Sequence, residues 1–239
     1  MIGEHKIKAT LIRSEFGSID MAIGNIDDPM KRRRRAQGPK SKALKFSSRL
    51  CVSCNSSRTQ AADREFDRFH SLARQLLENG NEPIAAFENN RYAPDSTPYV
   101  NFFRYFAKLL CCQIAEARGP RPIHLSRFAI GETHQNLIWL HIDRDWTFRQ
   151  ILQRIGPLQY AAHGGLALHG DKRTGGPKAF QSTISVGPLR YVFFSRLNWL
   201  ERCAIRIFHR DFDSLCRNKV KESIIEPLSL DERKSLGFD

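Results

Sequence analysis

The stretch RLCVSCNSSRTQAADREFDRFH, residues 49–70, decides how the first third of the chain is expected to fold. Cys51 and Cys54 have two residues between them, the spacing at which one loop offers two thiolates to one metal ion. Asn55 follows directly. A helix then begins, because Ser57 with Gln60 fits a capping box and apolar residues recur at helical spacing to Leu76. The stretch therefore predicts a metal-binding turn that leads into an amphipathic helix.

The composition favours an anionic partner. The chain has 239 residues, a formal net charge of +13 at pH 7 and a hydrophobic fraction of 41%, which is enough for a packed core. A protein this basic is expected to bind a polyanion, and DNA is the predicted partner. The alternative is a basic protein whose charge serves solubility alone.

The cysteine content and the hydropathy bear on location. The chain has six cysteines but no apolar signal core near its start, so the disulfide framework of a secreted protein is not expected. No apolar run is long enough to span a bilayer. The sequence therefore predicts a soluble, intracellular, cytoplasmic protein with reduced thiols and no membrane partner.

Residues 31–49 form a strongly basic stretch without an acidic residue. Gly38 and Pro39 indicate a loop, and such a stretch neutralises phosphate groups. The alternative is a disordered loop that only increases solubility. The nine residues predicted to bind nucleic acid are Lys31, Arg32, Arg33, Arg34, Arg35, Lys40, Lys42, Lys45 and Arg49.

Turn-forming residues at 81–98 divide the chain into two blocks, with a boundary or linker between 1–80 and 99–239. In the second block, apolar spacing predicts a helix over 99–118, and a hairpin over 180–194 turns at Gly187 and Pro188. This block is expected to be a mixed α/β domain. The sequence assigns it no role.

The pattern C-x-x-C-N, followed by Thr59 and by D-x-x-F-D-x-F, resembles the second half of HNH endonucleases of the ββα-metal type. In that family an acidic residue and a histidine end the first strand. Glu4 and His5 offer such a pair, although Lys8 stands where the family usually has proline. The resemblance implies an α+β protein, with a small ββα-metal, HNH-like module in residues 1–80 followed by the α/β domain.

The resemblance also implies roles for individual residues. His5 would be the general base that takes a proton from the attacking water, and Glu4 with Asn55 would hold a catalytic divalent ion, Mg²⁺ or Mn²⁺, or Zn²⁺. Cys51 and Cys54 would belong to a structural Zn²⁺ site. The His5 and Asn55 side chains are accordingly expected to face one small cleft.

The predicted zinc site lacks half of its ligands. Zinc-bearing members of the family have a first C-x-x-C shortly before the acidic-histidine pair, and structural zinc is nearly always four-coordinate. Here only three residues precede Glu4. We therefore expect either a truncated chain or a decayed site. Two ordinary thiols at a turn are the remaining alternative.

Three functions stay open. The first is an HNH-type, metal-dependent endonuclease that hydrolyses phosphodiester bonds in DNA. The second is a catalytically inactive nucleic-acid-binding protein with a decayed HNH fold. The third is a basic α/β protein in which the resemblance is accidental. The sequence specifies neither a DNA target nor an oligomeric state.

Overall fold

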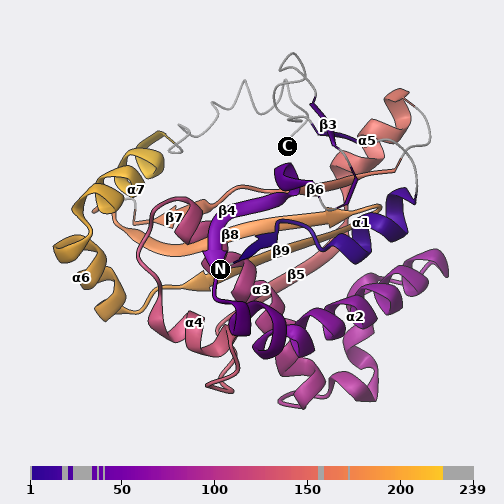
Figure 1. The fold of residues 1–239 in the computed structure, drawn as a ribbon, viewed down its shortest axis with the longest axis horizontal. Coiled ribbons are helices and arrows are strands. Elements are labelled where there is room, and N and C mark those ends of the chain that lie inside the picture. Colours follow the sequence, from indigo (N-terminus) through magenta and orange to yellow (C-terminus); the bar gives the residue numbers. More distant parts are fainter. Residues whose placement is uncertain are drawn as a thin grey trace, which may run out of the picture.

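The computed structural model describes residues 2–17, 21–23, 34–36, 38–39, 41–155, 159–171 and 173–222. Helices and antiparallel strands make up this part of the chain (Figure 1). The predicted α+β class is thereby confirmed.

The first part of the chain contains an antiparallel pair of strands followed by a helix. Strands β1 (Ile2–His5) and β4 (Lys45–Leu50) pair in antiparallel fashion, and a π-helical turn η2 (Cys54–Arg58) leads from β4 into α2 (Gln60–Glu78). Further helices and strands lie between the two paired strands, so the HNH-like ββα module predicted for residues 1–80 stays a prediction. The elements between β1 and β4 are α1 (Ala9–Phe16), β2 (Met21–Ile23), β3 (Arg34–Ala36) and η1 (Lys42–Leu44).

Helix α2 forms where the apolar spacing places it. Ala62, Phe66, Phe69 and Ala73 are buried along one face. The predicted capping box is wrong, because the Ser57 hydroxyl donates to the Ser53 carbonyl and no side chain caps the helix start. The helix ends before a glycine at position 80 whose φ of 82° suits a residue without a Cβ atom.

The predicted linker, residues 81–98, packs closely on its neighbours. It contains the 3-10 helices η3 (Pro83–Glu88) and η4 (Asn90–Tyr92). The ring centroids of Phe87 and Tyr92 lie 4.8 and 5.0 Å from that of Phe69 on α2. The helices α3 (Thr97–Glu116) and α4 (Ile123–Ala129) follow.

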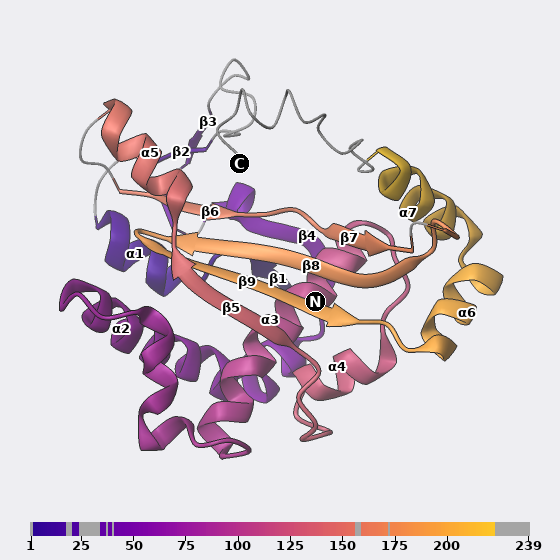
Figure 2. The ribbon, with the colours of Figure 1, turned by 180° about the vertical axis from the view of Figure 1, so that it is seen from behind.

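The second block is built on one antiparallel sheet (Figure 2). The predicted hairpin is confirmed as β8 and β9, with the turn at Gly187 and Pro188. The strand order is β5-β9-β8-β6, with β7 also paired to β8. The elements are β5 (Trp139–Arg144), α5 (Trp146–Ile155), β6 (Ala161–His163), β7 (Ala167–Gly170), β8 (Pro177–Val186), β9 (Leu189–Arg196), α6 (Trp199–Phe208) and α7 (Arg210–Glu222).

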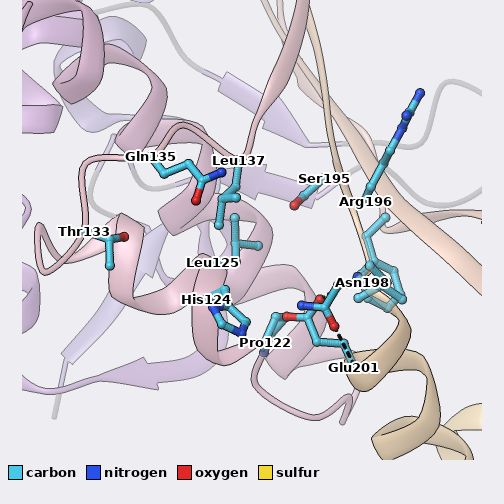
Figure 3. Close-up of a pocket in the computed structure, with 12 residues that line it drawn as sticks. Pro122, His124, Leu125, Thr133, Gln135, Leu137, Ser195, Arg196, Asn198 and Glu201 are labelled. Carbon is cyan, nitrogen blue, oxygen red and sulfur yellow. Dashed lines mark hydrogen bonds between the residues drawn. The ribbon is translucent and has the colours of Figure 1, made fainter. Parts of the chain in front are cut away.

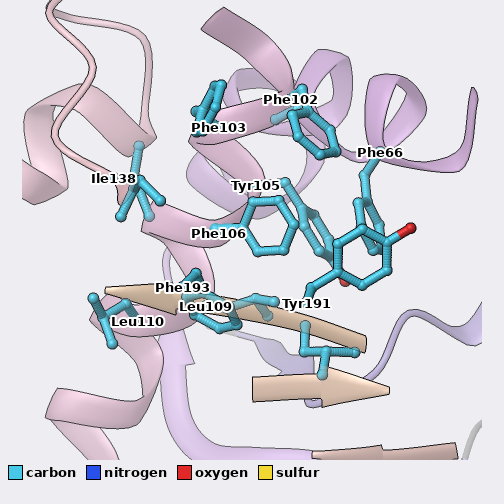
Figure 4. Close-up of a cluster of buried hydrophobic side chains, with 14 of the residues drawn as sticks. Phe66, Phe102, Phe103, Tyr105, Phe106, Leu109, Leu110, Ile138, Tyr191 and Phe193 are labelled. Carbon is cyan, nitrogen blue, oxygen red and sulfur yellow. The ribbon is translucent and has the colours of Figure 1, made fainter. Parts of the chain in front are cut away.

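The core joins α2 and α3 to this sheet (Figure 4). The Phe66 ring stacks on Tyr105 with a centroid distance of 3.9 Å and meets the edge of Tyr191 at 5.3 Å. Phe106 contacts Phe193 of β9 at 5.0 Å. One hydrophobic cluster therefore crosses the predicted boundary and joins the first part of the chain to the sheet. Aromatic side chains dominate this contact because they bury the largest apolar areas.

Helices α6 and α7 lie at one end of the sheet, and α2 lies at the other (Figure 1). No helix within the described ranges has both the length and the apolar character needed to cross a bilayer.

Candidate functional site

Strand β1 and helices α2 and α3 meet at a buried group of charges, Glu4, Asp63 and Lys108, which we name the Lys108 cluster. The Lys108 Nζ lies 3.0 Å from Glu4 Oε1 and 2.5 Å from Asp63 Oδ1. Lys108 is only 2% exposed. The cluster therefore consists of one ammonium group held between two carboxylates from elements far apart in the sequence.

A second lysine extends the cluster along α2. The Lys8 Nζ donates to Asp67 Oδ2 at 2.6 Å and to the Asp63 carbonyl at 2.5 Å. The Thr10 hydroxyl donates to Asp67 Oδ1 at 3.1 Å. The acidic residues near the start of α2 are thus held by the N-terminal segment and by α3.

The electrostatics favour a charged lysine in the cluster. Burial acts to lower the pKa of Lys108, but the negative charges of Asp63 and Glu4 outweigh it and the pKa is raised. Burial raises the pKa of Glu4, and the charge of Lys108 opposes that shift. Lys108 is therefore the cation that these carboxylates hold at neutral pH.

His5 ends β1, as predicted, and Asn55 lies in η2. Burial, together with the charges of Lys45, Lys108 and Arg13, lowers the pKa of His5, so its imidazole is neutral near pH 7. The His5 Nδ1 and the Asn55 Oδ1 are both buried without a hydrogen-bond partner. No hydrogen bond joins these two side chains in the part of the chain that the structure describes, so their shared cleft stays a prediction.

The predicted divalent ion was assigned to Glu4 and Asn55. The Asn55 Oδ1 is free to accept, but the Glu4 carboxylate already accepts from the Lys108 ammonium group. Among the described residues, no three His, Cys, Asp or Glu side chains gather closely enough to hold a metal ion. As arranged, the Lys108 ammonium group occupies the position beside the Glu4 carboxylate, and the divalent ion assigned to Glu4 and Asn55 stays a prediction.

The cysteines differ from the expectation of reduced thiols. The structure joins Cys51 and Cys54 in a disulfide, with a Cα separation of 5.2 Å that lies in the range of such bridges. The structural zinc site assigned to Cys51 and Cys54 stays a prediction. Free thiols are found at Cys111, Cys112, Cys203 and Cys216.

The basic stretch 31–49 is only partly covered by the structure, and its described parts include strands β3 and β4 rather than one loop. Lys42 is exposed and Lys45 is half-buried. The residues of this prediction that lie outside the described residues, or whose side chains do, are Lys31, Arg32, Arg33, Arg34, Arg35, Lys40 and Arg49.

A second charged region, which we name the α6 surface, consists of Trp199, Arg202, Arg206, Phe208 and Arg210. Trp199 and Phe208, the first and last residues of α6, are 65% and 76% exposed. The three arginines are exposed; Arg202 and Arg206 lie about one turn apart on α6, and Arg210 begins α7. Within the described residues, the guanidinium groups of these arginines make no hydrogen bond or ion pair, although the Arg202 backbone N–H donates to the Asn198 carbonyl. The α6 surface therefore combines uncompensated positive charge with two accessible aromatic rings.

A capping box fixes the start of helix α6, which lies beside a cavity. The Glu201 N–H donates to Asn198 Oδ1 at 2.8 Å and the Asn198 N–H donates to Glu201 Oε2 at 3.0 Å, a complete capping box. Both residues line a cavity of about 340 Å³ between α4, the end of β9 and the start of α6 (Figure 3). Its wall also carries His124 and Gln135. The cavity thus offers hydrogen-bonding groups next to the α6 surface.

Comparison with protein-family models, curated proteins and solved structures finds no match to this chain. The function is therefore argued from the residues themselves. Sequence reasoning missed both charged regions. The available signals were a lone lysine, Lys108, inside the apolar run 105–112, and the alternation of arginines with large apolar residues over 199–208.

Proposed function

We propose that the protein binds single-stranded nucleic acid, with DNA as the predicted form, and that it does so without catalysis. This is the alternative of a nucleic-acid-binding protein on a decayed HNH fold. The observation that supports it is the α6 surface, where Arg202 and Arg206 on α6 and Arg210 at the start of α7 are exposed, as are Trp199 and Phe208 on α6. Proteins that bind single strands combine cations for the phosphates with aromatic rings on which bases stack.

The charge and shape of this region favour nucleic acid over two other occupants. A second copy of the chain would bring the same arginines against one another, which costs energy through like-charge repulsion. An anionic membrane would accept the charge and the exposed Leu200 and Ile207. However, it would make no use of the donors and acceptors in the neighbouring cavity, such as His124 and Gln135, which suit the edge of an unstacked base.

The test is a fluorescence-anisotropy titration of a labelled single-stranded oligonucleotide at several salt concentrations. The double variant Arg202→Ala/Arg206→Ala should bind about tenfold more weakly or worse, because two phosphate contacts are lost. The slope of log K against log salt should fall by about 1.4, at roughly 0.7 for each contact on a single strand.

The matched control is Arg64→Ala/Arg149→Ala, which removes two exposed arginines from α2 and α5, away from α6 and the neighbouring cavity. Its affinity and salt slope should equal those of the wild type. An equal loss in both double variants would show that only net charge matters and would refute the α6 surface as the site. Sedimentation with phosphatidylserine-containing vesicles, without oligonucleotide binding, would replace this proposal with membrane binding.

A second function, a metal-dependent DNA endonuclease of HNH type, is favoured by one specific observation. The His5 Nδ1 and the Asn55 Oδ1 are buried without partners, and burial keeps the His5 imidazole neutral and able to accept a proton. If this function holds, the protein nicks plasmid DNA with Mg²⁺ or Mn²⁺. His5→Ala should then lose about 10²–10⁴-fold in rate with little change in DNA affinity. If the wild type nicks DNA with neither ion, the endonuclease function is rejected and nucleic-acid binding is the function that remains.

A further inference from the structure

We propose that Lys108 is a built-in cation that occupies a two-carboxylate site and keeps divalent metal ions out of it. The inference stands apart from the proposed nucleic-acid binding. It rests on the position of the Lys108 Nζ, 3.0 Å from Glu4 Oε1 and 2.5 Å from Asp63 Oδ1. These carboxylates come from β1 and α2, so the lysine on α3 closes a site that three elements build together.

The charge balance shows why the site suits a divalent ion once the lysine is removed. Two carboxylates surround one ammonium group, and the Lys8 Nζ bonds to the Asp63 backbone carbonyl and to Asp67 rather than to Glu4. Among the described residues, direct contact therefore compensates only one negative charge of the pair. Mg²⁺ and Mn²⁺ are commonly held by one or two carboxylates together with waters, and either ion would neutralise both charges.

A second observation marks the same place. The Tyr105 hydroxyl is buried without a hydrogen-bond partner, in a side chain that is 1% exposed. The Tyr105 ring centroid lies 5.5 Å from the Lys108 Nζ. Burial, followed by the charges of Asp63 and Glu4, raises the pKa of Tyr105, which places its hydroxyl in the field of these carboxylates. An unsatisfied oxygen beside the cluster is available to a water on a bound metal ion.

The test compares Mn²⁺ binding by the wild type and by Lys108→Met, which keeps the length of the side chain and removes its charge. Free Mn²⁺ is measured by electron paramagnetic resonance, with no nucleic acid present. Lys108→Met should bind one Mn²⁺ at least about tenfold more tightly than the wild type. The added site should disappear in Lys108→Met/Glu4→Gln. Lys108→Arg, which keeps the charge, should behave like the wild type.

Two results would overturn the inference. One is Mn²⁺ binding by the wild type that is as tight as in Lys108→Met and is lost in Glu4→Gln, since the lysine would then exclude nothing. The other is no Mn²⁺ binding by a folded Lys108→Met. If Lys108→Met is unfolded without metal, its folding is followed by circular dichroism as Mn²⁺ or K⁺ is added. Recovery of the folded signal with Mn²⁺, but not with K⁺ at equal ionic strength, supports the site, and no recovery refutes it.

Discussion

The Lys108 cluster and the α6 surface hold cationic side chains in opposite circumstances. In the cluster, Lys108 is 2% exposed and contacts two carboxylates. On the α6 surface, Arg202 and Arg206 are exposed and contact no carboxylate of the described residues. A buried charge must be paired within the protein, whereas an exposed charge needs no internal partner and stays available to a ligand. The difference separates a positive charge that holds the fold together from one that can bind a polyanion.

This contrast predicts very different costs for removing the two kinds of cation. Lys108→Ala should lower the free energy of unfolding by about 3–5 kcal/mol, because the buried Glu4 and the half-buried Asp63 would both lose their cationic partner. Arg206→Ala should change it by about 0.5 kcal/mol or less, as is usual at an exposed position. Urea unfolding followed by circular dichroism measures both. Equal losses would show that the two regions are not different in kind.

A buried histidine offers a pH-dependent test of the same interior. His70 on α2 shares a hydrogen bond of 2.9 Å with the Tyr191 hydroxyl on β9, and burial lowers the pKa of His70 from 6.5 to about 4. Between these values the unfolded chain binds a proton that the folded protein does not. Stability is therefore lost as the pH falls from 6.5 towards 4, by about 3 kcal/mol.

Urea unfolding at pH 7 and at pH 4.5 gives the free energy of unfolding that each protein loses on acidification. This loss should be smaller in His70→Gln, which has no titrating ring, than in the wild type. Other groups also titrate in this range. The contribution of His70 is therefore the difference between the losses of stability in the two proteins. An identical pH dependence in both would mean that His70 is not buried as a neutral ring.

The Cys51–Cys54 disulfide should contribute less to stability than Lys108 or His70, because the loop that it closes is short. Chain-entropy reasoning gives about 2 kcal/mol for a loop of roughly four residues. Cys51→Ser should therefore lower the free energy of unfolding by no more than this, and a reducing agent should leave Cys51→Ser unchanged. A loss as large as that of Lys108→Ala would show that the turn does more than connect β4 to α2.

Local patterns were sufficient for much of the fold. Apolar spacing predicted α2, and a glycine-proline turn predicted the β8–β9 hairpin, because both depend on neighbours in the sequence. The Lys108 cluster depends on tertiary packing, since Asp63 and Lys108 are 45 residues apart and only the contact of α2 with α3 brings them together. The α6 surface could not be predicted from the sequence, because the spacing of residues 199–208 fits a packed amphipathic helix equally well. Only the structure shows that these side chains are exposed.

The most direct test of the central claim is photocrosslinking to a single-stranded oligonucleotide that carries 5-iodouracil, followed by mass spectrometry of the crosslinked peptides. Iodouracil reacts with aromatic side chains that stack on it, so the method reports which rings touch the bases. We predict crosslinks at Trp199 or Phe208, with yields that fall in Arg202→Ala/Arg206→Ala and stay unchanged in Arg64→Ala/Arg149→Ala. Crosslinks confined to residues outside the α6 surface, with none at either ring, would contradict the account.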